Sequence, residues 1–289
     1  MLAKIALLCY NITWFSFEKR REKMKRYEIN FSHHSCESIP EALSESHCHD
    51  FYEILFVVNG SGKYVVEGAE YQVAPRTLML IRPFAYHHLS LDSSCVYERY
   101  LIHFRKSSIS PEAQKLLENM TGQKSDSGIY YPPRALSNTV ISVFDRLEVA
   151  ESLPTEEREA YIKILASELI ILLSASLGEK MVYSDDELGA RVIRYLNSNI
   201  ERDISLDKLS KRFFVSKYYL CRAFKKHNGV SVHGYINQKR IMYAKQLIES
   251  GETASGAAYK VGFGDYSAFY RAYVKIVGTS PTAEVKEDK

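Results

Sequence analysis

Four side chains in the first half of the chain have types and a spacing that suit ligand binding. His47, His49 and Glu53 occupy odd-numbered positions close together, and His87 follows later. Alternate side chains of a regular strand point to one face of a sheet, so these groups can converge inside a barrel. Three imidazoles and a carboxylate can bind iron, manganese, nickel or zinc. The same groups among aromatic side chains can instead hold the hydroxyl groups of a small metabolite.

The elements that must position these groups are short strands. Segments rich in β-branched and aromatic residues alternate with turn signals such as Asn59-Gly60-Ser61-Gly62. We predict strands at residues 51–58, 63–67, 70–73, 78–81 and 96–104. Short strands at this spacing favour a small antiparallel barrel or sandwich. Arg99 in the last strand joins the candidate pocket, with Tyr64 and Tyr86 as aromatic lining.

The spacing HxHxxxE, formed by His47, His49 and Glu53, resembles the first motif of the cupin proteins, and the segment 83–87 resembles the second. This likeness implies a β-barrel whose histidines and glutamate can hold a metal. Both motifs are incomplete, because Glu41 and Thr77 stand where cupins have glycine. Two interpretations stay open: a pocket that senses a sugar or related hydroxylated metabolite, which we favour, and a metal-dependent cupin enzyme or metal sensor.

Helical periodicity begins after Pro132-Pro133. Apolar residues recur at three- and four-residue spacing from Leu136 to Leu147 and again from Tyr161 to Leu173, which predicts two amphipathic helices. Such a pair can cover the barrel or form the seam of a homodimer. The segment 179–187 lacks apolar periodicity, and we interpret it as an interdomain linker.

Charge and cysteine content narrow the class of protein. The net charge of the 289 residues is +3, but from Ser184 onward 18 Lys and Arg face 12 Asp and Glu, a net of +6. The basic excess therefore lies in the C-terminal part, as a nucleic-acid-binding module requires. The five cysteines include no CxxC pair, which argues against a disulfide framework and favours a reducing cytoplasm. We expect residues 1–26 to be an extension outside the domains, and we expect no membrane role.

A capped helical pattern occurs twice in this basic region. Ser216 and Asp265 can each cap a helix, and each is followed at helical spacing by a large apolar residue and an aromatic one. The pairs are Leu220 with Phe224 and Phe269 with Tyr273, and an arginine follows each cap six residues later, Arg222 and Arg271. Residues 207–215 form a short helix and turn before the first cap, which is the order of a helix-turn-helix. Its outward side would present Lys217, Tyr218, Cys221, Arg222 and Lys225 to DNA.

Residues from about 204 to 284 resemble the C-terminal domain of the AraC/XylS family of transcription activators. The matching landmarks are Ser216, Tyr219-Leu220, Phe224-Lys225, Gly229, Tyr235, Arg240, Ala244, Leu247, Gly262-Phe263, Phe269, Arg271, Gly278 and Ser280-Pro281. The resemblance implies two helix-turn-helix units joined by a long helix, with recognition helices in successive major-groove segments. It places base contacts at Tyr218, Cys221, Arg222, Tyr266, Ser267 and Arg271, and we add Tyr270 to the DNA-contacting set.

The second unit departs from the family pattern. Ala254 and Ala257 replace bulky aliphatic residues, and Gly256 between them costs about 1 kcal/mol relative to alanine in a helix interior. We therefore expect the first unit to supply most of the sequence specificity.

These observations predict an α+β chain of two domains. A cupin-like β-barrel with a helical pair spans 27–178, and an all-α domain of two helix-turn-helix units spans 188–289. We expect a cytoplasmic, homodimeric transcription activator that binds double-stranded DNA, contacts RNA polymerase and responds to a small, carbohydrate-like effector. The effector would contact His47, His49, Glu53, His87 and Arg99. No catalytic residue, resident metal or cofactor is assigned.

Overall fold

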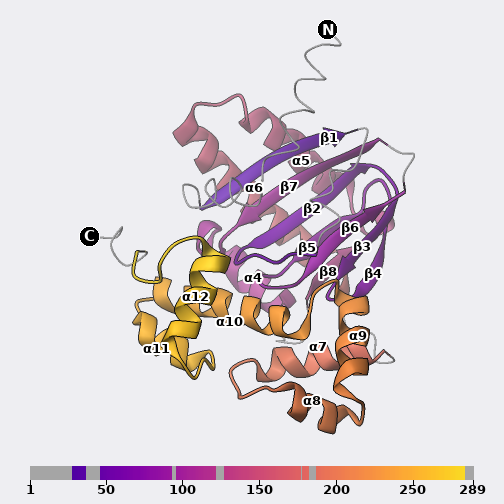
Figure 1. The fold of residues 1–289 in the computed structure, drawn as a ribbon. Coiled ribbons are helices and arrows are strands. Elements are labelled where there is room, and N and C mark those ends of the chain that lie inside the picture. Colours follow the sequence, from indigo (N-terminus) through magenta and orange to yellow (C-terminus); the bar gives the residue numbers. More distant parts are fainter. Residues whose placement is uncertain are drawn as a thin grey trace. The chain divides into compact units, whose positions relative to one another are not determined.

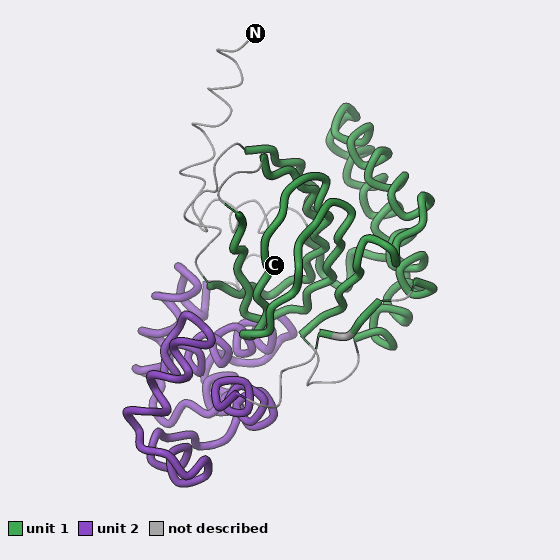
Figure 2. The backbone as a smooth tube through the Cα atoms, turned by 90° about the vertical axis from the view of Figure 1, so that its right-hand side faces the viewer, with its two compact units in different colours: residues 1–182 green, residues 183–289 purple. Residues whose placement is uncertain are grey.

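A computed structural model describes residues 28–36, 46–92, 96–121, 127–176, 178–181 and 187–283. The chain divides into two compact units, residues 1–182 and 183–289 (Figure 2). The extension predicted at residues 1–26 lies outside the described residues. No helix in the described part of the chain combines the length and the apolar character needed to cross a membrane.

The strands of the first unit form two antiparallel sheets (Figure 1). The six-stranded sheet has the order β1-β7-β2-β5-β8-β9, and the three-stranded sheet has the order β4-β3-β6. The strand bounds are β1 Ile29–Cys36, β2 Tyr52–Asn59, β3 Gly62–Val66, β4 Ala69–Val73, β5 Leu78–Ile81, β6 His87–Leu91, β7 Tyr97–Phe104, β8 Gly128–Tyr131 and β9 Glu179–Met181.

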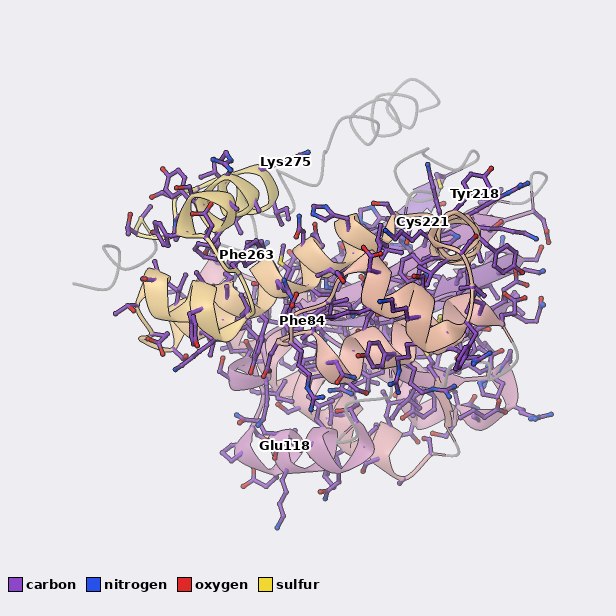
Figure 3. All side chains as sticks on the ribbon, turned by 60° about the horizontal axis from the view of Figure 1, so that its bottom comes forward. Phe84, Glu118, Tyr218, Cys221, Phe263 and Lys275 are labelled. Carbon is purple, nitrogen blue, oxygen red and sulfur yellow. The ribbon has the colours of Figure 1, made fainter. Side chains whose placement is uncertain are left out.

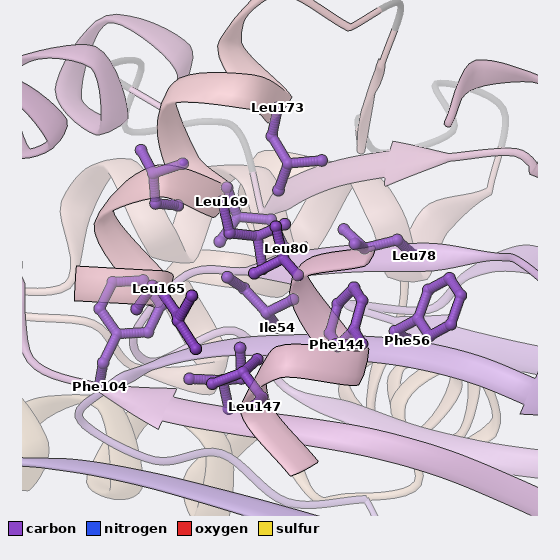
Figure 4. Packing of buried hydrophobic residues seen from close by; sticks show 14 of the residues in the cluster. Ile54, Phe56, Leu78, Leu80, Phe104, Phe144, Leu147, Leu165, Leu169 and Leu173 are labelled. Atoms are coloured by element: carbon purple, nitrogen blue, oxygen red, sulfur yellow. The ribbon is translucent and has the colours of Figure 1, made fainter. Parts of the chain in front are cut away.

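Strand β2 separates two hydrophobic layers because its side chains alternate between the faces of the sheet. Leu55 and Val57 belong to a cluster that includes Tyr64 and Leu89 of the smaller sheet, so odd-numbered residues face the barrel interior. Ile54 and Phe56 face the other way. They belong to a second cluster with residues of helices α5 (Asn138–Ala150) and α6 (Thr155–Ser174), and Figure 4 shows this packing. Glu53, Leu55 and Val57 therefore face the barrel interior, whereas Ile54 and Phe56 face the helices.

The remaining helical segments of the first unit are η1 Lys106–Ser108, α4 Pro111–Thr121 and η2 Pro133–Ala135. The side chain of Ser137 accepts a hydrogen bond from the Val140 amide, which caps the start of α5. Phe56 stacks on Phe144 of α5 with ring centroids 4.4 Å apart. The predicted helix pair thus covers the outer face of the six-stranded sheet.

The second unit is helical throughout. Its elements are α7 Leu188–Asn199, α8 Leu206–Phe213, α9 Lys217–Asn228, α10 Val232–Glu249, α11 Ala254–Lys260 and α12 Tyr266–Val277. Ser205, Ser216, Ser231, Thr253 and Asp265 are N-caps whose side chains accept hydrogen bonds from first-turn amides. These caps satisfy backbone donors that a helix start otherwise leaves free. The order α8–turn–α9 and α11–turn–α12 confirms the predicted fold class.

Several elements differ from the sequence prediction. Strands β1, β6, β8 and β9 and helix α4 were not predicted, because their sequences lack a clear apolar alternation or a helix-length apolar stripe. Residues Glu179–Met181, placed in the predicted linker, form β9 and pair with β8. The regular strand assumed from 47 to 53 is also wrong, since β2 begins at Tyr52 and His47 forms only an isolated bridge with His87.

Candidate functional site

The barrel interior contains a cluster of histidines around one carboxylate. Glu53 on β2 is 4% exposed, and its Oε2 lies 3.1 Å from His49 Nε2 and 2.9 Å from His103 Nε2. His87 Nε2 lies 3.8 Å from the same oxygen. The other carboxylate oxygen, Oε1, accepts a hydrogen bond from the Tyr64 hydroxyl at 2.9 Å. Four strands and loops thus converge on a single buried carboxylate.

The local structure explains why these groups meet. Glu53 and His103 are direct partners in the β2–β7 register, so both side chains lie on the inner face. His87 begins β6 in the opposite sheet, where it pairs with Val66. His49 lies in the segment before β2, and its carbonyl accepts a hydrogen bond from the Phe84 amide at 2.7 Å. Phe84 itself has a left-handed backbone with φ of 67°, a conformation that non-glycine residues seldom adopt.

Backbone contacts fix the orientation of two imidazoles. His49 donates from Nδ1 to the Phe51 carbonyl at 3.0 Å, and His87 donates from Nδ1 to the Ala85 carbonyl at 2.9 Å. An imidazole that donates from Nδ1 presents a lone pair at Nε2 when it is neutral. In their neutral forms, both histidines therefore point an Nε2 lone pair toward Glu53.

Burial sets the charge states in this cluster. Burial raises the pKa of Glu53, but His87, His103 and His49 lower it more, so the carboxyl pKa lies well below its usual value. Burial, with the neighbouring His47, lowers the pKa of His87 well below its ordinary value. Burial and the Glu53 carboxylate raise the pKa of Tyr64, which stays a hydroxyl donor. These shifts favour the ionised form of the Glu53 carboxyl and the neutral form of the His87 imidazole.

A second polar group lies farther along the same inner face. Arg99 is 5% exposed and pairs with Val57 in the β2–β7 register. Its guanidinium carbon lies 5.5 Å from the centroid of the Tyr97 ring. The Arg99 Nε atom has no hydrogen-bond partner among the described residues. The barrel interior therefore offers a buried cation as well as the histidine cluster.

The structure brings together most of the predicted pocket residues. His49, Glu53 and His87 converge, and Arg99 lies on the same inner face. His47 is half-buried next to His87, with ring centroids 4.5 Å apart. His103 was missed, since it lies fifty residues from Glu53 and outside any short motif. One signal in the sequence could have pointed to His103. Strand alternation in the predicted strand 96–104 places residues 99 and 103 on one face, so a pocket that includes Arg99 could also include His103.

The first helix-turn-helix presents its predicted DNA-contacting residues to solvent. Leu220 and Phe224 of α9 are fully buried, and Tyr218, 75% exposed, projects from the opposite side (Figure 3). Lys217, Arg222 and Lys225 are also exposed, whereas Cys221 is half-buried. Lys217 forms an exposed ion pair with Asp207, but Arg222 and Lys225 form none with any described residue.

The second helix-turn-helix has the same division of faces. Phe269, Tyr273 and Val277 of α12 are buried against Ile241 and other residues of α10. The predicted contacts Tyr266, Ser267, Tyr270 and Arg271 are all exposed. The Asp265 carboxylate caps the helix by accepting hydrogen bonds from the amides of Ser267 and Ala268. Ala257 and Ala258 are buried within this core, and Phe263 packs on Phe269 with ring centroids 5.4 Å apart.

The turns of the two units differ. In the first, Phe214 alone adopts a left-handed conformation (φ 55°), and it is 93% exposed. In the second, Gly262 has φ of 87°, and Phe263 and Gly264 follow before the cap. A Cβ on Gly262 would lie 2.7 Å from the Glu201 carbonyl oxygen and 2.9 Å from the Arg240 side chain. The second turn therefore requires glycine for both its conformation and its close packing.

Arg240 of α10 connects the two helix-turn-helix units. Its guanidinium donates hydrogen bonds to the carbonyls of Ile200 at 2.9 Å, Arg202 at 2.5 Å and Gly262 at 2.9 Å. Ile200 and Arg202 lie between α7 and α8, and Gly262 lies in the second turn. One buried side chain thus links the approach to the first unit with the turn of the second.

Comparison with known proteins agrees with both parts of this description. Residues 39–172 match the family described as AraC-like ligand binding domain, and residues 209–286 match the family described as Helix-turn-helix domain. The HTH-type transcriptional activator RhaS of Salmonella arizonae is 27% identical over 254 residues, covering 84% of this chain and 88% of that protein.

Two solved structures give weaker likenesses. An apo ToxT variant of Vibrio cholerae is 16% identical, covers 89% of this chain and 96% of that chain, and gives a TM-score of 0.40. The DNA-binding domain of AdpA in complex with a target DNA is 20% identical, covers 34% of this chain and 89% of that chain, and gives a TM-score of 0.32. On the two sequence matches, which together span both structural units, the chain belongs to the AraC family of transcription regulators, with an AraC-like ligand-binding domain followed by a helix-turn-helix domain.

Proposed function

We propose that this protein is a transcription activator that reads DNA mainly through α9 and responds to a small effector held inside the barrel. The observation that carries the DNA-reading part is the solvent face of α9. Tyr218, Arg222 and Lys225 are exposed at helical spacing, and their helix contains no acidic residue. Arg suits bidentate recognition of guanine in the major groove, and lysine neutralises phosphate.

The second unit is proposed as a supporting reader. Tyr266, Tyr270 and Arg271 are exposed on α12, but that helix carries fewer basic residues than α9. Electrostatic attraction to phosphate and base contacts should both be weaker there. We therefore assign most of the specificity to the first unit and additional affinity to the second.

The effector is proposed to bind between the two sheets. Buried donors and acceptors, among them Glu53, Tyr64 and Arg99, lie beside aromatic side chains. Such lining suits a hydroxylated metabolite of the sugar class, since aromatic faces cover C–H surfaces while charged groups hold hydroxyls. Effector binding would shift the population of DNA-competent molecules through the β2 strand, which contacts both the pocket and the helices.

Helices α5 and α6 are proposed as the dimer seam. Val149, Ile164 and Ile171 are exposed at 61%, 61% and 44%, and the two isoleucines lie seven residues apart on α6. Apolar side chains at that spacing form one stripe of a helix. Sedimentation of the full chain should give a dimer that Ile164→Lys dissociates; a monomer in both cases would refute this seam. Once bound to DNA in the cytoplasm, the dimer would contact RNA polymerase.

One substitution tests the DNA-reading proposal. Arg222→Ala should cost about 1–3 kcal/mol at one base position and relax the preference there. The measurement is selection of bound sequences from a random DNA pool, followed by affinities for single-base variants of the selected site. Lys226→Ala on the same helix is the matched control, expected to weaken binding evenly on all sequences. An even loss with Arg222→Ala would make Arg222 a phosphate contact and overturn its role as a base reader.

A further inference from the structure

In the histidine cluster, two imidazole nitrogens point at a carboxylate oxygen, and hydrogen bonds within the protein do not fully explain this arrangement. His49 and His87 donate from Nδ1 to backbone carbonyls, which leaves lone pairs at Nε2 when the rings are neutral. Both Nε2 atoms nevertheless point at Glu53 Oε2, which is itself an electron-pair donor. Electron pairs that face one another in a buried space repel unless a proton or a cation lies between them.

A proton can relieve only part of this repulsion. A single proton shared by His49 Nε2 and Glu53 Oε2 would account for their 3.1 Å contact. It leaves His87 unexplained, because His87 Nε2 has no hydrogen-bond partner among the described residues although the side chain is 1% exposed. A buried polar atom without a partner, aimed into a cluster of ligand-type atoms, indicates a missing binding partner.

The distances suit a metal ion. Atoms of His49, Glu53 and His103 that can bind a metal all lie within 4.8 Å of one another. Ligand atoms at about 2.1 Å from a tetrahedral ion are about 3.4 Å apart. The separations from Glu53 Oε2 to the three Nε2 atoms, 2.9, 3.1 and 3.8 Å, bracket that value.

The surrounding contacts also match those of metal ligands. Histidines that bind metals usually donate their other ring N–H to a carbonyl or carboxylate, which fixes the tautomer and the ring orientation. His49 and His87 do so through Phe51 and Ala85. The Tyr64 hydroxyl likewise donates to the second oxygen of Glu53. We propose that His49, Glu53, His87 and His103 bind a divalent first-row transition metal ion inside the barrel.

This site differs from the one expected from the HxHxxxE spacing. His103 of β7 takes part, through its register with Glu53, while His47 lies half-buried beside His87. The ion would join the segment before β2 with strands β2, β6 and β7, and so link the two sheets. Imidazole and carboxylate ligands suit zinc, iron(II), cobalt(II) and nickel(II) better than calcium or magnesium. The inference concerns metal binding alone and does not depend on the proposed DNA recognition.

Cobalt(II) is the probe for the test. Untagged full-length protein is stripped with a chelator, transferred to chelator-free buffer and titrated with Co²⁺. Its visible absorption reports coordination by protein ligands. We expect one ion per chain, displacement by Zn²⁺, and at least tenfold weaker binding in His103→Gln and Glu53→Gln. His88→Gln is the matched control, because His88 is the next residue on β6, lies on its other face and is only half-buried.

Two further measurements keep the test decisive if a variant fails to fold. X-ray absorption of the Zn²⁺-loaded parent protein should show nitrogen and oxygen ligands with the scattering pattern of imidazole. A specific DNA site selected with the parent protein serves as the folding control for every variant. No stoichiometric uptake, equal uptake by His103→Gln and His88→Gln, or sulfur scattering would overturn the proposal. Loss of DNA binding with normal metal uptake would count against the proposed function and leave the metal site standing.

Discussion

Replacing Arg240 by methionine should uncouple the two helix-turn-helix units. The guanidinium donates to the carbonyls of Ile200, Arg202 and Gly262, and the residue is 8% exposed. Methionine keeps much of the apolar stem and removes all three donors. The segment that leads into α8 and the turn that leads into α12 would then lose their common anchor.

The size of the effect follows from these three contacts. A hydrogen bond from a charged group contributes about 1.5–3 kcal/mol. The lower value is appropriate because Arg202 is exposed and Ile200 and Gly262 are half-buried, so water can reach their carbonyls. Three bonds then give a loss of about 4.5 kcal/mol. Burial lowers the pKa of Arg240, which indicates that the folded protein bears a desolvation cost for this charge. Methionine removes that cost, which offsets part of the loss. We expect a net destabilisation of the second helix-turn-helix of about 2–3 kcal/mol.

Two assays measure this prediction. Hydrogen exchange should become faster by roughly 30- to 150-fold in α10 and α11. Affinity should fall at least tenfold for DNA that carries both groove segments. A duplex with only the segment read by α9 should bind nearly as before. Lys239→Met is the matched control, since that ammonium lies over the Tyr235 ring and makes none of these three bonds. Unchanged exchange in the Arg240→Met protein, or equal losses on both duplexes, would refute the coupling role.

Two other predictions concern the turn and the barrel. Phe214→Gly should slow hydrogen exchange in α8 and α9 about fivefold, because a left-handed non-glycine residue costs about 1–2 kcal/mol and the ring is 93% exposed. Phe214→Ala is the control, since alanine keeps the strained left-handed conformation. Equally slowed exchange in Phe214→Ala would contradict the explanation. The folded-state pKa of His87 lies well below 6.5, so its contribution to stability is full above pH 6.5 and is lost as the pH falls below that value. Urea unfolding of chelated protein should show a slope of up to about 1.4 kcal/mol per pH unit there. If the unfolding free energy of the parent protein and of His87→Gln had the same slope against pH below 6.5, His87 would not be the group responsible.

The sequence predicts what local patterns encode. Caps and apolar stripes at helical spacing located α9 and α12, because Ser216 and Asp265 act on amides only two or three residues away. His103 could not be found in this way. Its approach to Glu53 depends on the register between β2 and β7, which many contacts distant in sequence determine together. Phe214 illustrates the same limit, since a phenylalanine gives no sign that it will adopt a left-handed turn.

Most of the predicted pocket residues lie together in the barrel interior, but not through the single regular strand that the sequence analysis assumed. Alternation assigns residues to a common face only within a regular strand. His47 and His49 precede β2, and the contacts of the bridge between His47 and His87 set their positions instead. Glu53 and Arg99 do lie in regular strands, and both occupy the inner face as predicted.

The alternation of side chains along β2 predicts where substitutions that change the response to the effector should lie. Glu53 and Ile54 are adjacent in sequence, yet one faces the ligand-type cluster and the other faces the helices α5 and α6. A shift of this strand by a fraction of an ångström would alter the fit of Phe56 against Phe144, which stack 4.4 Å apart. Substitutions at Phe56 or Phe144 could therefore mimic or block the response without touching the effector. A screen for variants that activate transcription in the absence of any inducer should find them on this outer layer, well away from the pocket itself.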